Sequence, residues 1–232
     1  DEDYEFSSFL SSKMHTAGVK CMDCHNPHTA KVILPGNNLC MRCHAAPTPA
    51  FPKAPVINPV AHTFHQPEST GSQCINCHMP QTVYMQRHSR HDHSFSIPDP
   101  LLTKQIGVPN ACNRCHTDMD VDWSLAATEK WYGAKMARPT RQRALTIAAA
   151  RNGDPASRDG LVKLIESETE SPSWKASAVR LLDPFMLEPS VFQKVMPLST
   201  HADPMVRASV ARAMEPLLNV RSPSAKSTLD KM

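Results

Sequence analysis

Eight cysteines constrain this 232-residue chain more than any other feature, because all eight fall in four copies of one five-residue motif. Each copy reads Cys-x-x-Cys-His, and no cysteine is left over. This motif is the attachment signature of c-type haem. The two thiols add across the porphyrin vinyl groups, and the histidine reaches the iron from the same side. The tight spacing is needed because one short turn must present three groups to one ring.

The sequence therefore predicts four covalently attached haem c groups. The cysteines that would hold them are Cys21, Cys24, Cys40, Cys43, Cys74, Cys77, Cys112 and Cys115, and the proximal iron ligands are His25, His44, His78 and His116. Zinc ribbons use CxxC pairs without needing a histidine after each pair. A disulfide scaffold would not repeat identical units, and thioredoxin-like chemistry needs one motif beside a βαβ pattern.

Haem attachment also predicts the location of the protein and changes the net charge of the haem-loaded form. Haem is joined to c-type apoproteins outside the cytoplasmic membrane, so we expect a periplasmic or extracellular protein whose signal peptide has been removed, leaving the acidic residues 1–3 first. No apolar run approaches the ~20 residues of a membrane span. The polypeptide carries a net charge of +3, but four haems add roughly eight propionates, which argues against a nucleic-acid role.

The chain is organised in two halves. Residues 1–120 hold every motif and 11 of the 12 histidines. Because four haems share only 120 residues, this tetrahaem domain cannot bury a large protein core. We expect an irregular chain of short helices and loops wrapped around the haems, with almost no sheet. The segment 46–55 carries four prolines, which favours an extended connector.

Residues 121–232 contain no cysteine and predict an all-α domain, so the fold class is mainly α. A helix is expected from Asp122 to Gly133, with Trp123, Trp131 and Tyr132 packing at the seam between the halves. Further helix starts are expected where a capping residue precedes proline, at 154–155, 171–172 and 203–204. A basic residue followed by alanine recurs every 32 residues, at 143–145, 175–177 and 207–209, and each copy opens an Ala-rich helix. This pattern resembles HEAT-type repeats, and a non-repeating helical bundle is the alternative.

Each haem held by one histidine needs a ligand on its other face. The histidines outside the motifs are His15, His28, His62, His65, His88, His91, His93 and His201. His28 lies three residues after His25 and would be strained on the same haem, so we expect it to bind a neighbouring one. Methionine is the alternative sixth ligand and would raise the potential. We favour two histidines at all four irons.

Several sequence blocks resemble a group of bacterial multihaem cytochromes in which a haem module is joined to TPR or HEAT-type helical repeats. The blocks are Lys13–His28, Gly36–Cys40, His62–His65, Cys77–Pro80, Tyr84–Met85, Asp92–Pro98 and Pro109–Cys112. The resemblance implies His15, His28, His62, His65 and His93 as ligand candidates. Five candidates for four irons leave one surplus, and His62 is the least favoured. His88 and His91 are not part of the pattern.

These features predict an electron-transfer protein and not an enzyme. Iron held by two histidines has no open position for a substrate, and closely spaced haems provide a path for single electrons. Redox proteins are the expected partners, and the helical repeats could join copies of the chain into an oligomer, polymer or filament. The alternative is a haem enzyme with one open iron that reduces or oxidises a small nitrogen or sulfur compound.

Overall fold

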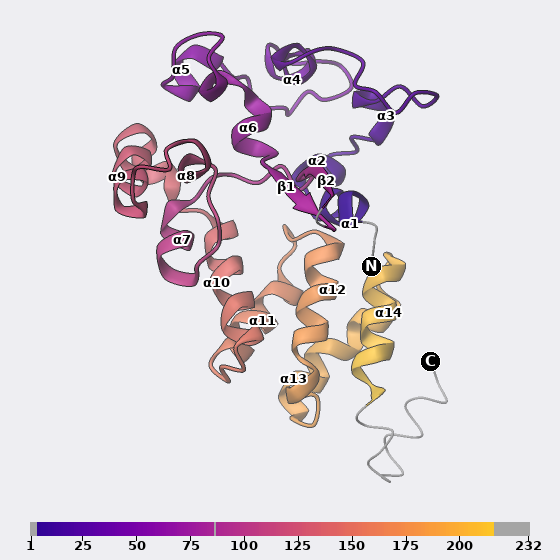
Figure 1. Cartoon of the computed structure of the whole chain (residues 1–232). Helices are drawn as coiled ribbons and strands as arrows, with labels where there is room; N and C mark the ends of the chain where they lie inside the picture. Colours follow the sequence, from indigo (N-terminus) through magenta and orange to yellow (C-terminus); the bar gives the residue numbers. More distant parts are fainter. Residues whose placement is uncertain (1–3, 86, 216–232) are drawn as a thin grey trace. The chain divides into compact units, whose positions relative to one another are not determined.

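The chain divides into two compact units, residues 1–136 and 137–232. The structure is a computed structural model that describes residues 4–85 and 87–215, so the acidic residues 1–3 lie outside the described part. Both units are mainly helical (Figure 1). None of the helices within the described ranges has the length and apolar character needed to cross a membrane.

Short helices and loops dominate the first unit. In chain order its helices are α1 (Tyr4–Leu10), α2 (Lys13–Thr16), α3 (Cys21–Cys24), α4 (Asn37–His44), α5 (Pro59–Thr63), η1 (Thr70–Ser72), α6 (Cys74–His78), α7 (Pro100–Ile106), α8 (Cys112–Cys115), α9 (Val121–Tyr132) and η2 (Gly133–Met136). Between α6 and α7, strands β1 (Gln81–Tyr84) and β2 (His88–His91) form an antiparallel hairpin, with Gln81 opposite His91. This hairpin is the one sheet among the described residues, which agrees with the expectation of almost no sheet.

Helix α9 belongs to the first unit, which therefore ends at residue 136 and not at 120. The helix forms as expected: the Asp120 carboxylate accepts from the Trp123 N–H, and Gly133 ends the helix with a positive φ of 50°. It packs against α7 and α8. The Asn113 side chain of α8 also donates to the Asp120 carbonyl and accepts from the Ser124 hydroxyl. These bonds tie α9 to the fourth motif.

The second unit consists of α10 (Pro139–Arg151), α11 (Ser157–Glu166), α12 (Pro172–Leu181), η3 (Asp183–Phe185), α13 (Pro189–Val195), η4 (Met196–Thr200) and α14 (Pro204–Ala213). Helix α12 packs against both α11 and α14, and Figure 1 shows it between them. The three segments spaced 32 residues apart lie in α10, α12 and α14. Leu161, Val179 and Val195 are fully buried in the core between these helices.

Two of the three predicted helix starts in this unit are confirmed. Ser171 and Asp203 cap α12 and α14, each followed by proline at the first helical position. The third is wrong. Pro155 lies in a turn, and α11 begins two residues later, at Ser157, although the Asp154 carboxylate accepts from the Ala156 N–H.

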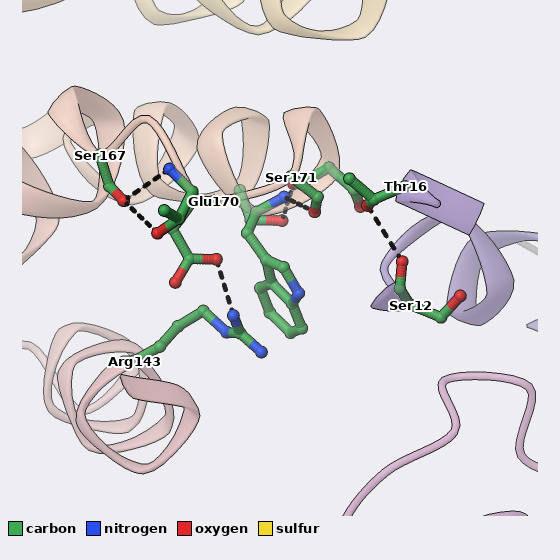
Figure 2. Close-up of polar contacts among 10 residues, drawn as sticks. Ser12, Thr16, Arg143, Ser167, Glu170 and Ser171 are labelled. Carbon is green, nitrogen blue, oxygen red and sulfur yellow. Dashed lines mark hydrogen bonds and ion pairs between the residues drawn. The ribbon is translucent and has the colours of Figure 1, made fainter. Parts of the chain in front are cut away.

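An ion pair joins α10 to the segment before α12. The Arg143 guanidinium donates to the Glu170 carboxylate over 2.7 Å (Figure 2). It also lies 4.3 Å above the Trp174 ring. The Arg143 and Glu170 side chains are only 17% and 10% exposed, so this contact forms part of the packing of the unit.

Apolar side chains are distributed very differently in the two units. Of the fourteen large hydrophobic residues that are exposed in the described ranges, twelve lie in the first unit. Val83, Met22 and Met85 are 68%, 62% and 61% exposed. Leaving this much apolar surface in water is unfavourable. The first unit therefore has apolar surface that a large apolar group would cover.

Candidate haem-binding site

Each CxxCH motif folds as one helical turn. Helices α3, α6 and α8 consist almost entirely of a motif, and α4 ends with one. The backbone N–H of His25 donates to the Cys21 carbonyl, and that of His116 donates to the Cys112 carbonyl, over 2.9 and 3.0 Å. This turn places both thiols and the histidine close together, as the attachment chemistry requires.

Five histidines among the candidate iron ligands have rings fixed by the same kind of hydrogen bond. In each, Nδ1 donates to a backbone carbonyl 2.6–2.9 Å away: His25 to Ala30, His44 to Pro55, His65 to Thr63, His78 to Ser96 and His93 to His91. A carbonyl oxygen can only accept, so Nδ1 is the donor, and in the neutral ring the lone pair lies on Nε2. Metal-ligating histidines are oriented in this way in general.

Three of the motif histidines face a second histidine ring. The ring centroids lie 6.2 Å apart for His25 and His93, 6.1 Å apart for His62 and His78, and 6.2 Å apart for His65 and His116. Two imidazoles on opposite sides of one metal ion, each bonded at about 2 Å, have centroids roughly 6.3 Å apart. The spacing of all three pairs therefore fits one iron between the rings.

His62 is the histidine that the sequence favoured least, yet its ring is the most nearly parallel to its partner, at 13°. His62 and His65 are both directed at motif histidines, and those histidines belong to two different motifs.

The second motif is arranged differently. Within the described part of the chain, none of the ring pairs includes His44. His15 lies on α2 with its ring 5.4 Å from that of Phe9, edge to face. His28 is exposed in the loop after α3, where its backbone N–H donates to the Asn26 side chain.

His88 and His91, which the resemblance left out, lie on β2. The His91 Nδ1 donates to the Met79 carbonyl, and its Nε2 contacts the Gln81 amide. Both nitrogens of His91 are thus engaged by protein groups.

Thiols of successive motifs lie near one another. Cys40 of the second motif hydrogen-bonds Cys74 of the third, which raises the pKa of Cys40 and lowers that of Cys74. Burial raises the pKa of Cys24, and the Cys43 thiol of the next motif raises it further.

The third and fourth motifs are linked in the same way. Burial raises the pKa of Cys77 to about 11, and Cys112 and Cys115 of the fourth motif add to the effect. Motifs one to four therefore follow one another in space as they do in the sequence.

Direct hydrogen bonds hold neighbouring motifs together. Arg42 in the second motif donates to the Asp23 carbonyl in the first over 2.7 Å. Asn37, at the start of α4, donates to the Ser72 carbonyl and accepts from the Cys74 N–H over 2.9 and 2.8 Å. Asn37 thereby sets the position of the third motif relative to the second.

A cavity of about 460 Å³ opens at the first motif. Cys21 and His25 line it together with His93, Met22 and Ala30. It thus brings together a thiol of the motif, the two paired histidines and apolar side chains. Together with the exposed apolar surface of this unit, these groups fit a haem.

The ring of His65, in the loop after α5, packs closely against the backbone at Gly71. A Cβ atom on Gly71 would lie 2.1 Å from Cδ2 of His65. Only glycine leaves room for the His65 ring at this position. The glycine was not singled out from the sequence, because its role depends on the folded position of His65.

Aromatic residues of α9 pack against three histidines of the site. Trp123 lies 4.7 Å from the His116 ring, and Trp131 lies 6.0 Å from the His65 ring. The Tyr132 ring lies 5.7 Å from that of His62. The sequence analysis expected these aromatic residues at a seam between the halves, but the contacts lie inside the first unit.

Comparison with known proteins identifies part of this site. Residues 15–48 match a protein-family model described as a doubled CXXCH motif. This segment is a c-type haem-binding module. It contains the first two motifs, so covalent haem c is the cofactor, and single-electron transfer is the chemistry that such modules most often serve. Searches of curated proteins and of solved structures found no match.

Proposed function

We propose that the protein is a tetrahaem c-type cytochrome that carries single electrons along four closely spaced haems. The observation that carries this proposal is the pairing of three motif histidines with a second histidine at 6.1–6.2 Å. Two further CxxCH turns, at 74–78 and 112–116, repeat the geometry of the matched segment. Each turn would hold one haem through its two cysteines.

The sixth ligands are proposed from the same pairs. His93 would complete the iron of the first motif, His62 that of the third and His65 that of the fourth. For the iron at His44 we propose His28, because the three-residue offset from His25 directs it away from its own haem. His15 is then the surplus candidate.

The bound haem would supply reversible one-electron exchange at its iron. The Nδ1–carbonyl bonds of His25, His44, His65, His78 and His93 would orient these five rings as ligands, and apolar side chains would exclude water. Both effects tune the potential. The proximity of thiols in successive motifs supports a path that follows the order of the motifs, since each thiol would mark the edge of one haem.

We propose that the protein works in the periplasm or outside the cell, after removal of a signal peptide, as is typical of c-type cytochromes. The second unit would be a HEAT-like docking module, supported by the recurrence of related segments in α10, α12 and α14. Residues 137–232 carry 14 basic and 10 acidic side chains, which suits acidic redox partners or the propionates of another copy. Such contacts could build an oligomer or a filament.

A second candidate is a haem enzyme with one open iron, acting on a small nitrogen or sulfur compound. It is favoured by one observation: among the described residues, no ring pair includes His44. The sixth position at that iron would then be free for a substrate.

The intact mass of the purified holoprotein tests the haem count. We expect the polypeptide mass plus four haem masses, and fewer than three haems would refute the proposal. Replacing His28 with alanine distinguishes the two candidates, because a carrier would gain one high-spin haem. An enzyme whose second iron is already open would show that high-spin signal in the unaltered protein.

A further inference from the structure

The segment His62–His65 directs its two histidines at two different motifs. His62 lies 6.1 Å from His78 of the third motif, and His65 lies 6.2 Å from His116 of the fourth. Only two residues separate them in the chain, so a movement of this short segment would displace both rings. Phe64, between them, has a left-handed backbone with φ 56°, which turns the chain sharply at this point.

The end of α9 holds the backbone and the central side chain of this segment. The Tyr132 hydroxyl donates to the His62 carbonyl over 2.7 Å. The Trp131 ring stacks on the Phe64 ring at 4.9 Å with an angle of 4° between the planes. The Tyr132 ring meets Phe64 edge to face at 5.8 Å. A hydrogen bond and two ring contacts thus restrain the backbone and the central side chain of the segment.

We propose that Trp131 and Tyr132 are positioning residues that hold the sixth ligands of the third and fourth irons together, as one unit. This inference rests on the proposed function, because it needs the two irons to be bound by His62 and His65. Residues 70 positions away in the chain would then decide whether these two irons are closed to external ligands. Neither Trp131 nor Tyr132 would touch a haem iron.

Carbon monoxide is the probe that tests the proposal, because ferrous haem binds it only when the sixth ligand leaves. In the reduced holoprotein we expect no binding, since all four irons carry two histidines. In the Trp131→Leu variant we expect carbon monoxide at two of the four haems. Trp131→Phe keeps an aromatic ring over Phe64 and should restore the unreactive state. Any stoichiometry other than two in Trp131→Leu overturns the proposal.

Three further variants separate positioning from a general loss of packing. Trp174→Leu removes a tryptophan from the second unit and should leave all four haems unreactive. Trp123→Leu removes the ring beside His116 and should open at most one haem. If Trp131→Leu does not assemble, Tyr132→Phe removes only the hydroxyl and should speed exchange of the His62 ligand by external imidazole several-fold. An unchanged exchange rate in Tyr132→Phe would also overturn the proposal.

Carbon monoxide binding in the unaltered protein distinguishes a failure of the proposed function from a failure of the positioning role. Carbon monoxide binding there would contradict the proposed function itself. A fully closed parent combined with a fully closed Trp131→Leu variant would contradict only the positioning role of α9.

Discussion

Gly71 offers a sharp test of the fourth iron, because its replacement by alanine places one methyl group against one ligand. The new Cβ would lie 2.1 Å from Cδ2, 2.6 Å from Cγ and 2.7 Å from Nε2 of His65. Ordinary contact begins at 3.4 Å. The ring must therefore move by about 1.3 Å, whereas a metal–ligand bond tolerates deviations of about 0.2 Å. We expect His65 to leave the iron.

The Gly71→Ala variant should thus keep four haems and convert one of them from low-spin to high-spin. Electron paramagnetic resonance of the ferric protein measures this as a high-spin signal equal to a quarter of the haem. Overpacking of this kind also costs about 1–3 kcal/mol of stability. A matched control is Gly160→Ala, whose Cβ would lie 2.8 Å from Cγ2 of Thr146 in the second unit. It should lower the melting temperature and leave every haem low-spin. A Gly71→Ala spectrum identical to the parent spectrum would refute the assignment of His65.

Two predictions concern the second unit. Arg143→Lys should destabilise it by about 1–3 kcal/mol in thermal unfolding followed by circular dichroism, because lysine loses the planar stack on Trp174 and the guanidinium bond to Glu170; an unchanged melting temperature would contradict this. Burial raises the pKa of Asp183, whose Oδ1 lacks a hydrogen bond among the described residues. The protonated form is favoured on folding, so stability falls as pH rises through the raised pKa. Asp183→Asn should therefore raise the melting temperature at pH 7, and the gain should vanish below about pH 4; a gain that persists there would show another cause.

Local features of this protein could be predicted from its sequence. The CxxCH turns form where the motif places them, since a pentapeptide carries all the groups that define the turn. The caps at Ser171 and Asp203 also hold, because capping depends on a side chain and an N–H two or three residues away.

Longer-range features could not be predicted in the same way. The pairing of His25 with His93 depends on how the hairpin and α3 come together in the fold, and no local pattern determines that. The sequence identified His62 and His65 as candidates but could not assign each to a motif. Helix α9 was predicted to within one residue at each end, but its bonds to the fourth motif place it in the first unit.

The most direct test of the central claim is spin quantification of the ferric holoprotein by electron paramagnetic resonance. Four haems with two histidines each predict low-spin iron equivalent to four haems per chain, and no high-spin signal. A high-spin signal equivalent to one haem or more in the unaltered protein would contradict an electron carrier with four closed irons.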